Sequence, residues 1–246
     1  MVNQLRTKIL SILLLLGLGL SNGSFQVCAS ESLGPVPLLS SDAIIQEGLH
    51  EIRASQTSCN IPSNLLRDLE RWYNLHPLIE YASLIETSIT VKFIDGSYTV
   101  LLDPFLEEKD IMRNPVHPYI YKRYQGSTNK TAVILNPAES MYGHYQCQRI
   151  ITTLLRQDYS IEYLANQAVD VSYIRHNLSA DIIYINTHAG YFDVDGDQQA
   201  DAVVIATGEF WTTETEQKYA YEYQNQLIVK GMVGDQGIVA FTPGFI

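Results

Sequence analysis

Apolar positions in the second half of the chain follow two alternating spacings. Short apolar runs bounded by polar residues predict strands, and apolar residues three to four positions apart predict helices between them. In chain order these are a strand at 131–136, a helix at 146–156, a strand at 159–164, a helix at 169–178 and a strand at 181–187. Strands that alternate with helices in this way form parallel sheets with right-handed crossovers. The pattern predicts an α/β domain over 131–246, with further strands at 202–206 and 238–242 and a helix at 219–233.

The first half of the chain has a different pattern. Residues 41–54 and 61–77 each carry an apolar stripe with helical spacing, and residues 88–102 alternate like a hairpin around an Asp-Gly turn. Together these elements predict a small α+β appendage, two helices and a hairpin, over 41–103. Residues 104–130 hold three prolines, mixed charges and few periodic apolar positions, which predicts a linker.

The N-terminal segment has the pattern of an export signal. Arg6 and Lys8 precede the apolar run Ile9–Leu20, which is too short to span a bilayer comfortably, and Ala29 ends a site with small residues for cleavage. We therefore expect residues 1–29 to be a signal peptide. The mature protein would then be secreted, periplasmic or on the cell surface, without stable membrane insertion. An uncleaved membrane anchor is the alternative.

Charge and cysteine content narrow the class of partners and the chemistry. The formal net charge is −11, and loss of Arg6 and Lys8 with the signal peptide takes it from −11 to −13. Nucleic-acid-binding proteins need basic surfaces, so this charge argues against a nucleic-acid partner and suits a protein that binds cations. We expect a protein or peptide partner, which the sequence does not identify. Cys59 and Cys147, the cysteines left after cleavage, either form a disulfide or are two buried thiols.

The most specific local motif is a run of aspartates in the sequence DVDGDQQAD. Asp193, Asp195, Asp197 and Asp201 occupy positions 1, 3, 5 and 9 of a loop, and Gln199 at position 7 offers its backbone carbonyl. Calcium takes six to eight oxygen ligands in such loops, and carboxylates this close repel one another without a cation. We therefore predict a structural Ca²⁺ site. Magnesium fits less well because it prefers rigid octahedral geometry, and the remaining alternative is a solvated acidic turn without an ion.

The loop resembles a known class of calcium site. It departs from a full EF-hand, because position 12 is Val204 and a predicted strand follows in place of a helix. It is similar to the calcium loops of integrin-type β-propeller repeats, whose pattern is DxDGDxxxD followed by an apolar strand. One copy cannot form a propeller, so the resemblance implies calcium ligation and nothing about the fold.

His188 follows the third predicted strand of the α/β domain, and ligands of open α/β sheets gather at the carboxyl ends of strands. This order resembles the caspase- and gingipain-like cysteine peptidases of clan CD, in which a catalytic histidine follows the third parallel strand and a nucleophilic cysteine follows a later one. The resemblance covers residues 131–246 and implies a caspase-like, Rossmann-like parallel sheet with His188 as a partial or vestigial catalytic residue. Glu209, after a later strand, is a candidate acid or orienting carboxylate that faces His188.

Two departures from that family concern its catalytic residues. Ala189 follows His188 where the family usually has glycine, and no cysteine occurs after Cys147. Cys147 itself falls on the apolar face of a predicted helix, where a thiol is usually inert. We therefore expect a member without its nucleophile, shortened before the segment that would carry it.

Three functions fit these features, and whether the protein is an enzyme stays open. The first is an exported peptidase-like domain with a structural calcium ion and no catalytic cysteine. The second is a calcium-dependent module that binds a protein or glycan through surface aromatic residues. Those aromatic residues are Trp211, Tyr219, Tyr221 and Tyr223. The third is an active metal-dependent hydrolase that uses His188 beside the carboxylates of the aspartate loop and Glu209.

Overall fold

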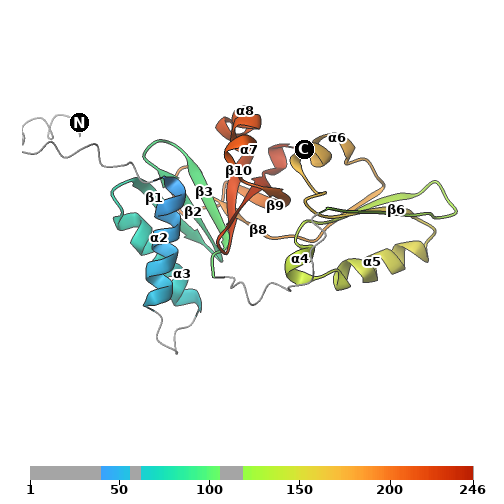
Figure 1. Cartoon of the computed structure of the whole chain (residues 1–246), viewed down its shortest axis with the longest axis horizontal. Coiled ribbons are helices and arrows are strands. Elements are labelled where there is room, and N and C mark those ends of the chain that lie inside the picture. The colour runs from blue at the N-terminus through green and yellow to red at the C-terminus, as the bar shows by residue number, and fades with distance from the viewer. Residues whose placement is uncertain (1–39, 56–61, 106–118, 246) are drawn as a thin grey trace, which may run out of the picture. The chain divides into compact units, whose positions relative to one another are not determined.

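The computed structural model describes residues 40–55, 62–105 and 119–245, which belong to one compact unit. Helices and strands are mixed along the chain, and the strands form two sheets (Figure 1). The α/β class expected from the sequence is thereby confirmed. The parallel sheet expected over 131–246 is present only in part, because the strands at 202–210 and 236–241 pair antiparallel in the other sheet. The predicted signal peptide and Cys59 lie outside the described residues. Within the described ranges, no helix is long and apolar enough to cross a membrane.

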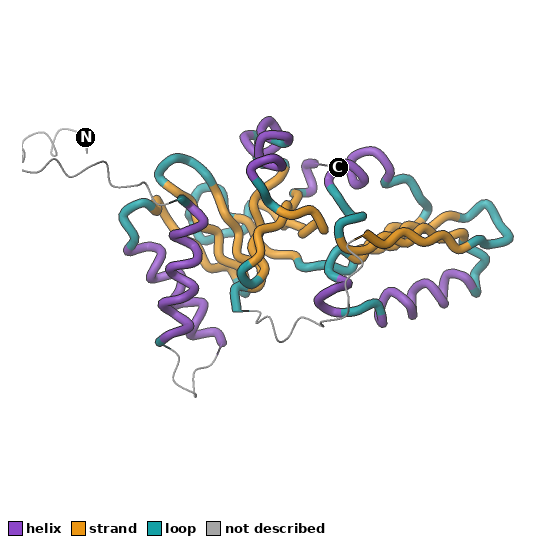
Figure 2. The backbone as a smooth tube through the Cα atoms, viewed as in Figure 1, coloured by secondary structure: helices purple, strands orange, loops and turns teal. Residues whose placement is uncertain are grey.

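Strands and helices have the following bounds. One sheet contains β1 (Ile79–Ile85), β2 (Ser88–Phe93), β3 (Tyr98–Asp103), β8 (Ala189–Phe192), β9 (Ala202–Phe210), β10 (Ile228–Val233) and β11 (Gln236–Phe241). The other contains β4 (Tyr119–Tyr124), β5 (Thr131–Asn136), β6 (Ser160–Asn166) and β7 (Ile182–Ile185). The helices are α2 (Ser41–Ala54), α3 (Pro62–Leu75), α4 (Glu139–Tyr142), α5 (Tyr145–Leu155), α6 (Val171–Asn177), α7 (Thr213–Lys218), α8 (Ala220–Gln224) and the short 3₁₀ turn η2 (Pro243–Phe245). The strand orders are β1-β2-β3-β10-β11-β9-β8 and β4-β6-β5-β7. Figure 2 shows the strands in orange and the helices in purple.

The four-stranded sheet contains the β-α-β-α-β unit expected from the sequence. β5 lies between β6 and β7 and pairs in parallel with both. Helix α5 packs on the face that carries Ala132 and Ile134 of β5. Helix α6 packs on the opposite face (Figure 1), where Val133 and Leu135 meet its apolar residues. Alternate residues of one strand therefore face two different helical layers.

The linker predicted at 104–130 is wrong in its later part. Residues 119–124 form strand β4, which pairs antiparallel with β6 at the edge of the sheet. Edge strands tolerate charged residues such as Lys122 and Arg123, so the mixed charge that indicated a linker is equally typical of an edge strand. Residues 106–118 lie outside the part of the chain that the structure describes.

The helix predicted at 219–233 is also wrong. Within this range only Ala220–Gln224, near its start, is helical, and Ile228–Val233 is the fully buried strand β10. A short apolar run reads alike as a buried helix or a buried strand, and its β-branched residues favour the strand. Tertiary position decides the outcome, because β10 lies between β3 and β11.

Residues 41–103 do not form a separate appendage. The predicted hairpin is present as β2 and β3, and β1, which the sequence did not indicate, pairs with β2. β3 then pairs in parallel with β10, so the N-terminal strands continue into the C-terminal ones as one sheet. The pairing partners are far apart in sequence, and a local hydrophobic pattern carries no information on such pairing.

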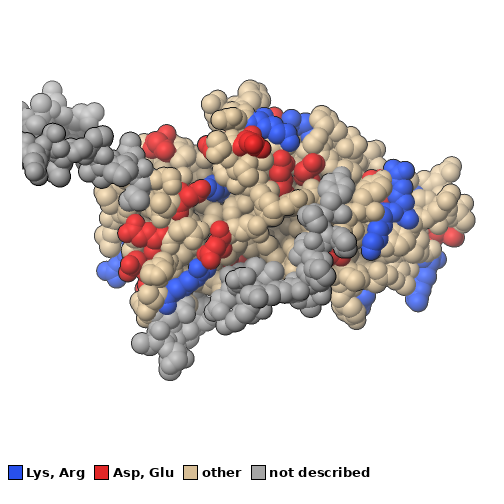
Figure 3. Space-filling model, in the orientation of Figure 1, with Lys and Arg blue, Asp and Glu red and all other residues tan. Residues whose placement is uncertain are grey.

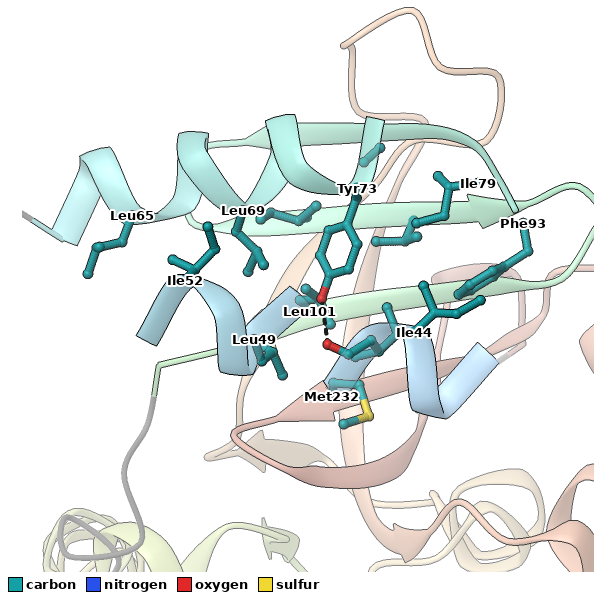
Figure 4. Close-up of a cluster of buried hydrophobic side chains, with 14 residues drawn as sticks. Ile44, Leu49, Ile52, Leu65, Leu69, Tyr73, Ile79, Phe93, Leu101 and Met232 are labelled. Atoms are coloured by element: carbon teal, nitrogen blue, oxygen red, sulfur yellow. Dashed lines mark hydrogen bonds between the residues drawn. The ribbon is translucent and has the colours of Figure 1, made fainter. Parts of the chain in front are cut away.

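Helices α2 and α3 cover β1–β3 through an apolar cluster (Figure 4). Ile44 and Leu49 from α2 belong to it together with Leu69 and Tyr73 from α3. The Tyr73 hydroxyl donates a hydrogen bond to the backbone carbonyl of Ile45 at 2.9 Å. Burial of a hydroxyl is costly without such a partner. The helical stripes read from the sequence are therefore confirmed as core-packing faces.

Charged side chains are mostly at the surface. On the face shown in Figure 3, carboxylates are spread over the part that carries α2, α3 and β1–β3. Among the described residues, the buried charged side chains are Lys230 and Asp193. Lys230 on β10 forms an ion pair with Asp42 in the first turn of α2. A buried ammonium needs such a partner, so the pair connects α2 to the middle of the sheet.

The two sheets meet where β9 passes the end of β6. A Cβ atom built on Gly208 of β9 would lie 1.8 Å from the backbone oxygen of Asn166, so only glycine fits. The Gly208 amide also donates to the carbonyl of Val169 at 2.8 Å. One apolar cluster also includes residues of both sheets, with Val133 and Leu135 of β5 and Val239 and Phe241 of β11.

We predict that Gly208→Ala lowers the free energy of unfolding by about 2–3 kcal/mol, because β9 or the end of β6 must move to admit a methyl group. Gly244→Ala is the matched control, since a Cβ atom there meets Leu227 at an ordinary contact of 3.6 Å. Urea unfolding followed by circular dichroism measures both variants. Equal stabilities would contradict the close approach of the two backbones.

Candidate functional site

The predicted metal loop connects β8 to β9, which are an antiparallel pair. Asp193 directly follows β8, and its exposed fraction is 0%. One of its carboxylate oxygens accepts the amide of Gly196 at 2.7 Å, and the other accepts the amide of Gln198 at 2.9 Å. Buried carboxylates require hydrogen-bond partners, and these two amides hold the Asp193 side chain in one orientation.

The backbone geometry of the loop explains its tight turn. Gly196 has a φ of +80° and Gln198 a φ of +66°, both in the left-handed region. A Cβ atom on Gly196 would lie 3.0 Å from the ring of Tyr81, so both conformation and space favour glycine. Asp195 and Asp197 each accept the backbone amide two residues ahead, at 3.2 Å and 2.8 Å. This is the Asx-turn pattern that aspartate favours.

The structure brings three of the five predicted metal ligands together. Asp193, Asp195 and Asp197 each place a carboxylate oxygen within 4.8 Å of the others, and the group could hold a metal ion. Asp201 is outside this group and accepts a backbone amide of the loop at 2.7 Å. The side-chain amide of Gln199 donates to Asp197 at 2.9 Å. The three clustered residues offer oxygen ligands, which hard cations prefer.

Side chains from β1–β3 hold this loop, and the sequence pattern did not indicate them. The Tyr81 hydroxyl donates to the backbone carbonyl of Asp193 at 3.0 Å, and the Tyr98 hydroxyl donates to that of Val194 at 3.1 Å. The Asp193 amide donates to the Thr90 hydroxyl at 3.1 Å. Burial, aided by Tyr98 and Asp193, raises the pKa of Tyr81 far above its usual value, so its hydroxyl stays protonated and can donate.

His188 lies where the chain passes from the four-stranded to the seven-stranded sheet. It stands between the end of β7 at Ile185 and the start of β8 at Ala189. Its backbone carbonyl accepts the amide of Ala206 on β9 at 3.0 Å. The neighbouring Thr187 hydroxyl donates to the Ala206 carbonyl at 2.9 Å. His188 thus follows the third parallel strand, and β9 fixes its backbone.

The environment of His188 favours a neutral ring. Burial lowers the pKa of His188 below its ordinary value, and the carboxylate of Asp103, at the end of β3, opposes this shift. The ring is therefore uncharged near neutral pH and keeps one nitrogen able to accept a proton. It lines a cavity with residues from both sheets.

Glu209 does not face His188, so the predicted pairing of these two residues is wrong. The residues on either side of Glu209 line the cavity of His188, and alternation along β9 turns Glu209 the other way. Its carboxylate accepts the Val171 amide at 3.1 Å and the Tyr219 hydroxyl at 3.1 Å, and it lies 3.4 Å from the Lys218 ammonium. A carboxylate bonded to the first amide of α6 stabilises the start of that helix.

Cys147 is no nucleophile in this structure. Its thiol is buried in α5, and burial together with the charge of Glu139 raises its pKa to about 11. The thiolate is the reactive form of cysteine, so a protonated and enclosed thiol is inert. This agrees with the expectation from its place on an apolar helical face. Its suggested disulfide partner, Cys59, lies outside the described residues.

Comparison with known proteins reveals no relative of this chain. No protein-family model, no curated protein and no solved structure matches it. Any assignment of function depends on the geometry of the aspartate loop and of the histidine cavity.

We predict that His188→Asn flattens the pH dependence of stability between about pH 5 and pH 7. The pKa of His188 in the folded protein lies below its unfolded value of about 6.5, so unfolding takes up a proton in this window. The wild-type protein therefore loses stability as the pH falls, and the variant loses less. Urea unfolding in EDTA, which keeps cations off the aspartate loop, measures the difference.

His50→Asn is the control for this experiment, because it removes an imidazole that is exposed on α2 and does not line the cavity. An unchanged pH dependence in His188→Asn would contradict a buried, neutral imidazole.

Proposed function

We propose that the protein is an exported, peptidase-like α/β protein whose loop at 193–201 binds a structural calcium ion. The observation that supports this most strongly is the burial of Asp193. Its carboxylate has no exposed surface and lies close to the carboxylates of Asp195 and Asp197. Like charges at this separation raise one another's energy, and a divalent cation offsets the repulsion.

Calcium suits this loop better than other cations. The clustered ligand atoms are carboxylate oxygens, whereas zinc and copper favour nitrogen and sulfur. Calcium accepts six to eight oxygens in irregular geometry, and water with the Gln199 carbonyl or the Asp201 carboxylate would complete its shell. Magnesium needs a near-ideal octahedron, which aspartates at alternate positions of one turn supply less readily.

A calcium ion here would act on stability. Tyr81, Thr90 and Tyr98 hold the backbone of residues 193–194, so the loop is tied to strands from the N-terminal part of the sheet. A ligand stabilises the state that it binds, and the bound loop needs these strands in place. The ion would therefore favour the folded seven-stranded sheet.

The peptidase-like part of the proposal rests on strand order. The parallel order β6-β5-β7, with α5 and α6 on opposite faces and His188 after β7, supports the resemblance to clan CD peptidases. The cysteine of that family has no counterpart in the described ranges, where Cys147 is buried in α5. We therefore propose a peptidase-like domain that lacks a cysteine nucleophile.

The two other candidate functions receive less support. A binding surface built on the aromatic residues of 211–223 needs accessible rings. Tyr219 is buried, however, and the Tyr223 hydroxyl is bonded to the backbone of Tyr98 at 3.0 Å and 3.1 Å. A metal-dependent hydrolase needs His188 beside the cation, and the aspartate cluster does not include it.

Calcium is expected to raise the melting temperature of the full chain by about 5–10 °C at about 100 times its Kd. Asp195→Asn should lose most of this gain, because it removes one charged ligand but keeps an oxygen for the turn. Without calcium the variant should be as stable as the wild type or more so, since a repulsive charge is gone. Differential scanning calorimetry with calcium and with EDTA measures both effects.

Asp68→Asn is the matched control, because Asp68 is exposed on α3 and should keep the full calcium response. A calcium response that is equal in Asp195→Asn and Asp68→Asn would refute the site. A response to magnesium as large as that to calcium would overturn the choice of ion.

Export is tested by the N-terminus of the released protein. Expression in a secreting host is expected to yield a protein that begins at Ser30, after cleavage behind Ala29. Mass spectrometry of the N-terminal peptide measures this. Recovery of a membrane fraction that still contains Arg6 and Lys8 would support the uncleaved anchor instead.

A further inference from the structure

The cavity at the carboxyl edge of the four-stranded sheet brings together residues that are distant in sequence. Its volume is about 80 Å³, and its polar lining residues are Ser140, Asn166, Gln167, Thr187, His188, Thr207 and Gln236. Ligands of open α/β sheets bind outside the carboxyl ends of the strands, where helices on opposite faces leave a gap. The cavity lies at such a place, because β5 and β7 are adjacent, parallel strands and the chain continues from their carboxyl ends to Ser140 and His188.

Ser140 and His188 reach this cavity from two neighbouring strand ends. Ser140 lies in α4, directly after the turn that ends β5, and its amide donates to the Asn166 side chain at 2.9 Å. His188 lies three residues after β7, with its carbonyl bonded to Ala206. The backbones of both residues are thus fixed by bonds to other strands, which is what a preorganised site requires.

The threonine hydroxyl groups in the lining already donate hydrogen bonds to backbone carbonyls. Thr187 donates its hydroxyl proton to Ala206, and Thr207 donates its own to the carbonyl of Val239 at 2.8 Å. For Ser140, no such bond from the hydroxyl to another described residue is present. Of the lining hydroxyls on described residues, the Ser140 hydroxyl is therefore the one available to react.

His188 has the surroundings of a general base. Among the described residues that line the cavity it is the titratable one, and the negative charge of Asp103, at the end of β3, raises its pKa. A neutral imidazole near a carboxylate can take a proton from a hydroxyl and is stabilised while it carries the charge. A serine, a histidine and an aspartate in these three roles form an acyl-transfer constellation.

We propose that Ser140 is a nucleophile, His188 its general base and Asp103 a positioning residue, and that the cavity hydrolyses esters of short acyl groups. The assignment rests on the proposed peptidase-like role of His188 and replaces the missing cysteine by a serine. The apolar lining residues Met141, Val233 and Ile238 and the small volume suit a short alkyl chain.

The reaction balances without a cofactor. The Ser140 oxygen attacks the ester carbonyl carbon, its proton passes to His188, and the ester C–O bond breaks as the leaving alcohol takes that proton. Water then attacks the acyl-serine and gives a proton to His188. The acid is released, and the Ser140 oxygen recovers the proton.

A fluorophosphonate probe tests the nucleophile in the full chain. The Ser140 oxygen would form a bond to phosphorus, fluoride would leave, and the proton would pass through His188 to solvent. Peptide mass spectrometry should find the label on Ser140. Ser140→Ala should abolish it, and His188→Asn should slow labelling about 100-fold or more. Ser127→Ala is the control. Ser127 is exposed in the loop after β4, so its replacement should leave the labelling of Ser140 unchanged.

Hydrolysis of p-nitrophenyl acetate tests the role of Asp103. The negative charge of Asp103 raises the pKa of His188, so Asp103→Asn should move the acidic limb of the rate profile to lower pH. A structural effect would lower the rate without moving the limb, and that result would remove Asp103 from the constellation.

Wild-type protein that responds to calcium but takes no label on Ser140 would overturn the serine assignment and leave the calcium proposal intact. Label on Ser140 without a response to calcium would support the serine assignment and overturn the calcium proposal. Circular dichroism of each variant separates loss of reaction from loss of folding.

Discussion

The antiparallel pairing of β8 with β9 holds both candidate sites in place. At one end of the pair, the Ala206 amide donates to the carbonyl of His188 at 3.0 Å. At the other end, the Asp201 amide donates to the carbonyl of Phe192 at 3.0 Å and closes the aspartate loop. A slip of one residue in such a pair turns every side chain to the other face, so the register that places Asp193 also places the histidine.

The same strand joins the two sheets. Gly208 of β9 lies against the backbone of Asn166, and Glu209, on the other face, bonds to the first amide of α6. One face of β9 therefore contacts the end of β6, and the other face contacts helix α6. Gly208 also lines the cavity of His188, and a larger residue at this position would enter the space of β6.

Local patterns in the sequence predicted the features whose causes are local. The carboxylates of Asp193, Asp195 and Asp197 cluster because aspartate favours the turns that bring them together, and a glycine between them admits a positive φ. The parallel orientation of β5, β6 and β7 follows in the same way from the alternation of strands and helices.

Features that depend on contacts between residues far apart in the sequence could not be predicted from local sequence patterns. Tyr81 and Thr90 hold the loop from strands about a hundred positions earlier, and no spacing rule relates them to it. The error on Glu209 has a different cause. The predicted strand ended at residue 206, whereas β9 continues to Phe210, so the pleat decides which way Glu209 points. Ser140 carries no motif, and only the cavity that it shares with His188 identifies it.

A crystal structure of the full chain with calcium would test the central claim most directly. We expect one ion in the loop, with anomalous scattering at its centre and oxygens of Asp193, Asp195 and Asp197 at about 2.3–2.6 Å. An empty loop at saturating calcium, with these carboxylates bonded only to backbone amides, would contradict the account.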